Sequence, residues 1–417
     1  MRFKVTKYEH YIIRIIIIFL LLISYDSFWF GTSGIAIFTT IRNIFLMLLP
    51  LVLLVVNKPK ISQKNGKILL FVILIVLFSS IINGNGVGAI ALIISGMLLG
   101  LVFVNKYSAT EFFSAFSDAI LLIAAYSFLV WILVSLHFLP TSPISNMADA
   151  EMTTSCGCVF FPILANIAVR NSSFFREPGV YMILLNISLI FELFILTNKN
   201  RKIRVGLLIA SLLSTISTAG IIICCIIMLV FCYKQKISFI TWIIIFIVIS
   251  TALSMEVLLG DYINEMFGKF ETMTEYGSGF ARYSSVVVPL NIFLDNPLFG
   301  CGFTQFPIEY EKTGYELFHR YIDSKGLATN TFLNIYAIFG IFFGVFMTCG
   351  LYQFCKLISR GSKFYALLFC LIYFLMFSNE SMPYFSFLYI FFYYGFNRSS
   401  SYDFLKNKGT FCPAHNN

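Results

Sequence analysis

Charged residues are scarce in this sequence. Asp, Glu, Lys and Arg together make up 12% of the 417 residues, whereas hydrophobic residues make up 59%. A soluble globular protein carries about 25% charged residues, because its surface faces water. The scarcity therefore excludes a soluble fold. Since backbone polar groups in lipid must be satisfied within the bilayer, the apolar runs of this chain predict an all-α integral membrane protein.

Metal ligands and nucleotide-binding motifs are also missing. The chain has four His residues and ten Cys residues, most of the latter inside apolar stretches. Cys156 and Cys158 form a Cys-Gly-Cys pair, but no second Cys or His pair stands at the spacing of zinc ligands. The element Gly300-Cys301-Gly302 lacks the Gly-Lys-Ser/Thr that completes a nucleotide P-loop. We therefore predict no metal and no cofactor.

Apolar runs of about the length that a bilayer requires, roughly 17–25 residues, recur along the chain. Small polar residues at 214–220 interrupt the run 205–233, so we expect two short helices there; one long crossing would leave eleven spans. We predict about 12 transmembrane helices in a single polytopic membrane domain, residues 1–417. The runs lie near 11–30, 35–56, 68–83, 87–104, 114–139, 178–197, 205–218, 220–233, 238–259, 327–353, 364–378 and 382–396.

The basic residues decide the orientation. With the N-terminus inside, twenty of the 29 Lys and Arg residues fall in the N-terminal segment, the inside loops or the C-terminal tail, and seven fall outside. This positive-inside pattern places both termini in the cytoplasm. A single crossing over 205–233 would move the basic cluster at 356–363 outside, which favours twelve spans. Because the net charge of +9 is explained by these loops, we expect no nucleic-acid partner.

Two outer segments, about 140–177 and 260–326, are too long to be simple connections. Loops beyond about 12–15 residues are usually functional or disordered. We expect a short helix in the second segment, lying either along the outer membrane interface or on top of the bundle. Its apolar stripe consists of Ile263, Met266, Phe267, Phe270 and Met273.

A polar segment stands directly before one central span, with the sequence Phe175-Arg176-Glu177-Pro178-Gly179. Pro178 suits the first turn of a helix, so Arg176 and Glu177 are expected at the positive end of that helix, at the outer mouth of the bundle. An Arg fork beside helix N-terminal amides suits a phosphate or diphosphate. The alternative is a helix-capping turn with a surface ion pair.

Further polar residues follow in and after the second outer segment. Arg282 precedes an apolar stretch that ends in turns at 296–303. Asn330 opens the next span, in which Gly340 and Gly344 are spaced for close helix packing. His319 lies just upstream of that span, and it is either a catalytic residue or a plain surface residue.

Two arginines lie inside predicted spans. Arg14 is near the inner face, where its side chain can snorkel toward water. Arg42 lies deeper, where a charge usually faces a polar cavity. We therefore consider Arg42 a candidate for lining a groove that holds lipid phosphate.

These motifs together resemble the bacterial O-antigen polymerase and O-antigen ligase superfamily. The resemblance rests on Arg-Glu-Pro-Gly at 176–179, on Arg282 followed by Asn-Pro-Leu-Phe-Gly-Cys-Gly-Phe at 296–303, and on Asn-Thr-Phe-Leu-Asn at 330–334. It implies a multi-pass glycosyltransferase of the bacterial inner membrane. Such a polymerase joins undecaprenyl-diphosphate-linked repeat units into O-antigen, or a related surface polysaccharide, at the periplasmic face without a nucleotide sugar.

The resemblance also implies roles for particular residues. Arg176 and Arg282 would bind the diphosphate of the lipid carriers, with Glu177 beside them. Arg42 is our third candidate for the diphosphate, and Asn330 is a candidate for substrate binding. The general base stays open between Glu177 and His319. A chain-length regulator and a flippase of the same pathway are the protein partners that the resemblance implies.

One departure separates the alternatives. Ligases of this superfamily usually carry a His-Asn pair where this chain has Thr329-Asn330, which favours a polymerase. An O-antigen ligase remains one alternative. The other is a polytopic flippase or transporter of lipid-linked oligosaccharide, which predicts charged residues deep within several spans, and the central spans of this chain are almost bare of them.

Overall fold

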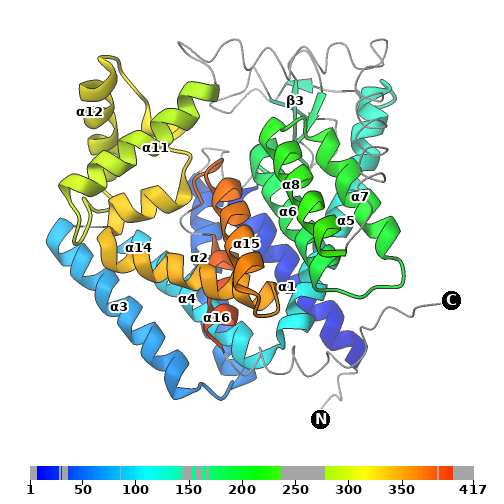
Figure 1. Ribbon diagram of the computed structural model, residues 1–417, viewed down its shortest axis with the longest axis horizontal. Helices are drawn as coiled ribbons and strands as arrows, with labels where there is room; N and C mark the ends of the chain where they lie inside the picture. The colour runs from blue at the N-terminus through cyan, green and yellow to red at the C-terminus, as the bar shows by residue number, and fades with distance from the viewer. Residues whose placement is uncertain are drawn as a thin grey trace.

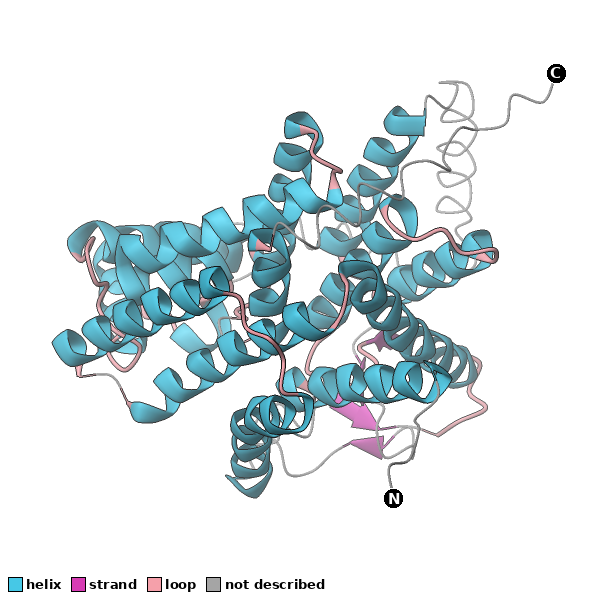
Figure 2. Cartoon of the chain, turned by 90° about the horizontal axis from the view of Figure 1, so that it is seen from below, coloured by secondary structure: helices cyan, strands magenta, loops and turns pink. Residues whose placement is uncertain are grey.

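The computed structural model describes residues 7–27, 30, 36–84, 86–140, 142–143, 153–155, 162–165, 169–235, 278–382 and 385–397. Helices make up most of this part, and the strands form one small cluster (Figure 2). The helices are α1 (Lys7–Asp26), α2 (Ala36–Asn57), α3 (Gln63–Asn83), α4 (Val87–Lys106), α5 (Ala109–Ser135), α6 (Pro178–Phe194), α7 (Arg201–Ser214), α8 (Thr218–Gln235), α11 (Ser278–Asp295), α12 (Phe306–Phe318), α13 (Ser324–Leu327), α14 (Thr331–Ile358), α15 (Lys363–Phe377) and α16 (Ser386–Phe396).

The prediction of an all-α, multi-pass membrane protein is confirmed. Within the described ranges, α2, α3, α4, α5, α8 and α14 are long and apolar enough to cross a bilayer, and α6, α15 and α16 are shorter apolar helices. The run 205–233 forms two helices, α7 and α8, which part at 215–217 as expected. The predicted span 238–259, the apolar stripe at 263–273 and the pair Cys156 and Cys158 lie outside the described residues.

Helix α6 is the buried centre of one half of the bundle. Every residue from Val180 to Phe194 is buried, and α6 packs against α5, α7 and α8. Rings hold this core together, with 4.5 Å between the centroids of Phe113 and Phe191 and 4.7 Å between those of Phe354 and Phe391. Because lipid tails are as apolar as these side chains, close packing between helices stabilises such a core more than exclusion of water does. The N-terminus of α6 is therefore held firmly in place.

A buried ionic cluster joins α5, α6 and α7. The guanidinium of Arg204 contacts the Glu192 carboxylate at 2.6 Å and the Asp118 carboxylate at 2.5 Å. Glu192 is fully buried and also accepts a hydrogen bond of 2.6 Å from Ser117. The cluster lies in the last turn of α6, the end opposite to Pro178. These charges thus sit near a helix end rather than deep in the middle of the bundle.

The first long outer segment contributes a structure that we did not predict. Strands β1 (Ser142–Pro143), β2 (Thr153–Ser155), β3 (Pro162–Ala165) and β4 (Val169–Asn171) form an antiparallel sheet in the order β1-β2-β3-β4. The sheet leads directly into the turn before α6. Its strands are only two to four residues long. Strands of that length leave little alternating pattern in a sequence.

Helices α11 and α12 lie together at one side of the bundle, with α11 against α14 (Figure 1). Helix α14 is broken at Gly340, whose φ of 75° is left-handed. The loop after α11 fills the break, because Cys301 N–H donates to Ala337 O at 2.9 Å and Ile341 N–H donates to Pro297 O at 2.8 Å. We had expected Gly340 to mediate close packing between helices. It instead admits a loop, since a Cβ there would meet Leu298 O at 2.2 Å.

Candidate active site

The turn before α6 presents Arg176 as predicted. Phe175 is buried beneath the turn, where it stacks on Tyr181 and forms an isolated bridge to Ser27 at the end of α1. Glu177 is the N-cap and Pro178 occupies the first helical turn, the position where its missing N–H costs nothing. The sequence thus fixes the Arg176 backbone at the positive end of a buried helix.

Arg176 is held by two carboxylates. One amino group, Nη1, bonds to Glu177 Oε1, and the other, Nη2, donates to Glu380 Oε2 at 2.9 Å. The Glu380 side chain is 7% exposed, whereas that of Glu177 is 44% exposed. The expected ion pair with Glu177 is therefore present, but a more buried acid shares the same guanidinium.

Arg282 reaches the same place from the second turn of α11. Its Nη1 donates to Asn379 Oδ1, one residue before Glu380. The guanidinium also lies within the electrostatic reach of the Glu380 and Glu177 carboxylates. Two arginines from distant motifs thus converge on Asn379 and Glu380, in the short loop between α15 and α16.

The loop that carries Glu380 is pinned by the start of α14. Thr331 Oγ1 donates to Glu380 O at 2.5 Å and accepts from Met382 N–H at 2.8 Å. Asn334 Nδ2 donates to Ser381 Oγ at 3.2 Å. The polar residues of the 330–334 motif therefore hold the acidic loop in position against the two arginines.

Gly179 allows the Glu380 carboxylate to lie against the α6 backbone. A Cβ built at Gly179 would stand 2.0 Å from Glu380 Oε1, where real contacts are never so short. Residues of the Arg-Glu-Pro-Gly motif thus have distinct structural roles in this fold. Arg176 binds the carboxylate, Pro178 starts the helix, and Gly179 leaves room for Glu380.

The other predicted substrate residue has a structural role in this state. Asn330 is the N-cap of α14, and its Oδ1 accepts from Leu333 N–H at 3.0 Å. The neighbouring Thr329 donates from Oγ1 to Ser378 O at 3.4 Å. Asn330 lies one residue from the threonine that holds Glu380, so it borders the convergent arginines.

His319 and Arg42 take other positions. His319 is exposed and forms the left-handed C-cap of α12, with φ of 52° and its N–H bonded to Tyr315 O at 2.8 Å. Arg42 is half-buried in α2, where Nη1 donates to Phe30 O at 2.9 Å and Nε to Asn43 Oδ1 at 3.2 Å. The contacts that the structure gives to Arg176 and Arg282 run to Glu177, Asn379 and Glu380 instead. Roles for His319 and Arg42 remain predictions.

The 296–303 motif has a structural role and contributes no catalytic side chain to the site. Phe299 O accepts hydrogen bonds from Ser79 Oγ at 2.8 Å and from Asn83 Nδ2 at 3.3 Å, which fix the loop to α3. Burial raises the pKa of the Cys301 thiol to about 12, so this sulfur is protonated and a poor nucleophile at neutral pH. In the part of the chain that the structure describes, no three His, Cys, Asp or Glu side chains group as metal ligands would.

Five convergent residues combine two cations with two carboxylates at a helix N-terminus. They are Arg176, Glu177, Arg282, Asn379 and Glu380. The cations can bind a diphosphate through charge-assisted hydrogen bonds. A buried carboxylate can accept a proton from a hydroxyl. Sequence reasoning missed Asn379 and Glu380, although they form a polar break between two apolar runs on the predicted outer side.

Comparison with known proteins bears on this site. A family model described as O-antigen ligase matches residues 185–348, and this confirms the resemblance to the O-antigen ligase and polymerase superfamily. The matched part includes Arg282 and Asn330, whereas Arg176 and Glu380 flank it on either side. No curated protein matches the chain significantly. The match covers 164 of the 417 residues and, together with the apolar helices, supports a multi-pass membrane protein similar to this family.

Proposed function

We propose that this protein is a polymerase of the O-antigen ligase and polymerase superfamily, which joins undecaprenyl-diphosphate-linked repeat units at the periplasmic face of the inner membrane. The observation that carries the proposal is the convergence of two arginines on one short loop, where Arg176 binds the buried Glu380 carboxylate and Arg282 donates to the neighbouring Asn379. A lipid diphosphate and a sugar hydroxyl are the two partners that such a set of groups suits. The superfamily match supports the glycosyl-transfer chemistry.

In the proposed reaction, a hydroxyl oxygen of the acceptor repeat unit attacks the anomeric carbon of the donor glycan. The bond between that carbon and the diphosphate oxygen breaks, and its electron pair stays on the leaving lipid diphosphate. The hydroxyl proton passes to the Glu380 carboxylate. The step needs no further reactant.

The two arginines stabilise the leaving group. Negative charge develops on the diphosphate as its bond to carbon breaks, and a fixed guanidinium fork stabilises that charge without reorganising. The N-terminus of α6 adds a positive dipole end on the same side as Arg176. Removal of one such donor typically lowers the rate by about 10²–10³-fold.

Glu380 is the base that we assign, in place of the open choice between Glu177 and His319. At rest it is bound to Arg176. A diphosphate carries more negative charge than a carboxylate, so a bound donor competes with Glu380 for that guanidinium. The donor thereby releases Glu380 to accept a proton from the acceptor hydroxyl. The base becomes available when the donor is in place.

An O-antigen ligase is the second candidate, because the matched family model bears that description. The residue at 329 argues for the polymerase. Thr329 stands where ligases usually carry His, and its hydroxyl is engaged with Ser378 O at 3.4 Å. A threonine hydroxyl does not titrate near neutral pH, so it does not replace a histidine base.

Deletion of the gene separates the candidates by the lipopolysaccharide that accumulates. The polymerase predicts a single repeat unit on the core, the ligase predicts free lipid-linked polymer, and a flippase predicts core with no repeat unit. A full-length ladder in the deletion strain would contradict the polymerase.

Point variants test the site within that strain. Arg176→Gln and Arg282→Gln should each reproduce the single-repeat phenotype at wild-type protein level. Glu380→Gln should do the same, because a general base typically contributes about 10²–10⁴-fold. Glu177→Gln is the matched control, since Glu177 binds the same arginine but is the more exposed acid. Loss of polymer in Glu177→Gln with full ladders in Glu380→Gln would reverse the assignment.

A further inference from the structure

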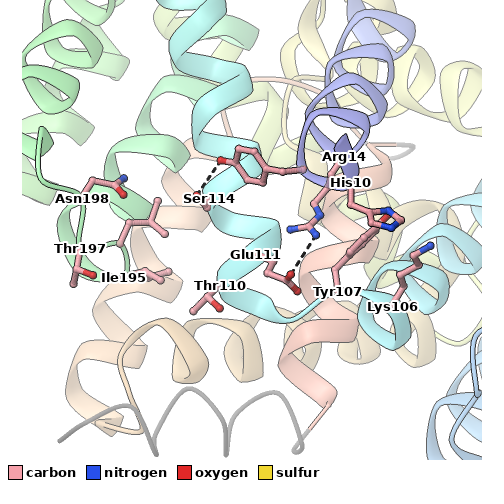
Figure 3. Close-up of a pocket in the computed structure, with 12 residues that line it drawn as sticks. His10, Arg14, Lys106, Tyr107, Thr110, Glu111, Ser114, Ile195, Thr197 and Asn198 are labelled. Atoms are coloured by element: carbon pink, nitrogen blue, oxygen red, sulfur yellow. Dashed lines mark hydrogen bonds and ion pairs between the residues drawn. The ribbon is translucent and has the colours of Figure 1, made fainter. Parts of the chain in front are cut away.

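A cavity with several polar lining residues lies at the other ends of the helices, on the side that the basic loops predict to be cytoplasmic. It has a volume of about 1030 Å³ and is lined by residues of α1, of the end of α4, of the first turns of α5 and of the segment after α6 (Figure 3). Its polar wall includes His10, Arg14, Lys106, Tyr107, Glu111 and Asn198. None of these residues belongs to the site proposed above.

Arg14 is the central cation of this cavity. Its side chain is 7% exposed, its Nη2 donates to Glu111 Oε1 at 3.2 Å, and its guanidinium carbon lies 4.4 Å from the Tyr107 ring centroid. The buried Nε has no hydrogen-bond partner among the residues that the structure describes. A buried guanidinium nitrogen without a partner is costly, and an anionic ligand that approaches the group lowers that cost.

Glu111 does not neutralise the cavity. Its second oxygen, Oε2, already accepts hydrogen bonds from the Ser108 amide at 3.0 Å and the Ser108 hydroxyl at 2.9 Å, as part of the capping box of α5. Lys106 adds a second cation, bonded to Asn57 and 5.7 Å from the Tyr107 ring centroid. Among the described lining residues, two full positive charges thus face one negative charge.

Helix α1, which supplies part of the cavity wall, also has an apolar face that is exposed on the outside of the bundle. Ile195 and Leu196 form an apolar part of the cavity wall. On α1, next to Arg14, Ile13 is 46% exposed and Ile16 is 49% exposed. Such side chains are exposed in a membrane protein because they contact acyl chains. A ligand with an anionic head and apolar tails therefore fits both parts of the surroundings.

We propose that this cavity binds the phosphate head group of an anionic phospholipid from the inner leaflet. Arg14 and Lys106 contact the phosphate, and the acyl chains lie along the exposed face of α1. Basic pockets between helices on the cytoplasmic side recognise anionic head groups in this way. The proposal does not depend on the polymerase assignment.

Native mass spectrometry of the purified protein, titrated with phosphatidylglycerol or with phosphatidylcholine, tests the proposal. Wild type should retain phosphatidylglycerol in preference to phosphatidylcholine. Lys106→Gln, at an exposed position that tolerates the change, should weaken phosphatidylglycerol binding by about fivefold, since one basic residue contributes about 1 kcal/mol. Lys363→Gln removes an exposed lysine outside the cavity and should leave the affinity unchanged.

Two results would overturn the proposal. One is equal affinity for phosphatidylglycerol in wild type and Lys106→Gln. The other comes from thermal unfolding in phosphatidylcholine vesicles with added inorganic phosphate. If phosphate alone stabilises wild type as much as phosphatidylglycerol does, and Lys106→Gln removes that gain, the ligand is a soluble phosphate. Arg14→Gln should weaken lipid binding further, and Lys106→Gln decides the question if Arg14→Gln does not fold.

Discussion

The contact between Gly179 and Glu380 gives a prediction whose size follows from the structure. In Gly179→Ala, the new methyl group would stand 2.0 Å from Glu380 Oε1, whereas ordinary contacts begin at 3.4 Å. The carboxylate must therefore retreat by about 1.4 Å, the difference between these two distances. The Ala residue itself fits the first turn of a helix. The substitution thus moves the proposed base while the helix stays intact.

A displacement of this size should lower activity sharply. Misplacement of a catalytic group by about 1 Å can cost about 10²-fold in rate. We expect Gly179→Ala to shorten the polymer to one or a few repeat units in the deletion strain, at wild-type protein level and with a nearly unchanged midpoint of thermal unfolding in detergent. Gly206→Ala is the matched control, because nothing lies within 4 Å of its added Cβ. It should give full ladders.

A second substitution tests the direction of the displacement. In Gly179→Ala/Glu380→Asp, the shorter acid relieves the overlap with the methyl group, so the double variant should be more active than the product of the two single effects predicts. Residues in contact typically show such coupling at about 0.5–3 kcal/mol. Wild-type ladders in Gly179→Ala, or strictly additive effects in the double variant, would refute the assigned position of Glu380.

Three other predictions concern the break in α14, the buried ionic cluster and His319. Gly340→Ala should lower the midpoint of thermal unfolding far more than Gly361→Ala, because both have a left-handed φ but only the Cβ at Gly340 meets backbone atoms. Equal losses would contradict the role given to the loop. Arg204→Met leaves Glu192 buried without its cation and should cost about 3–5 kcal/mol in a chemical unfolding experiment, whereas an unchanged stability would show that the pair is dispensable. His319→Asn keeps a residue that tolerates the left-handed cap and should retain full ladders; loss of polymer at normal protein level would restore His319 as a candidate base.

The helices and the two arginines were predictable because their signals are local. A run of apolar residues identifies a span wherever it occurs, and the polar break at 215–217 marks two helices without any knowledge of their neighbours. Pro178 likewise predicts the start of α6 from its own position in the sequence. Arg176 and Arg282 were found because each stands in a short motif on the predicted outer side.

Glu380 could not be found in this way. Its partner Arg176 lies 204 positions earlier, and no periodic pattern links the two. The segment around Glu380 has the composition of an ordinary turn between two spans. Its place on the same predicted side as Arg176 is shared with Glu177 and with the acids of 260–326, and only the packing of α6 against the loop after α15 brings Glu380 into contact with Arg176.

The role of Gly340 could not be predicted from the sequence for a different reason. A glycine inside an apolar run fits close helix packing as well as a broken helix. The difference is made by residues 297–302, which insert their backbone where Gly340 lacks a side chain. The motif at 296–303 and the glycine some forty residues later are therefore one structural feature, which sequence reasoning treated as two.

Reconstitution of the purified protein in liposomes, with undecaprenyl-diphosphate-linked repeat units as the sole glycan substrate, tests the central claim most directly. We predict a ladder of polymer with one lipid diphosphate released for each linkage formed, and loss of both products in Arg282→Gln and Glu380→Gln. Polymer at the wild-type rate in either variant, or transfer that requires added lipid A-core, would contradict a polymerase built on these residues.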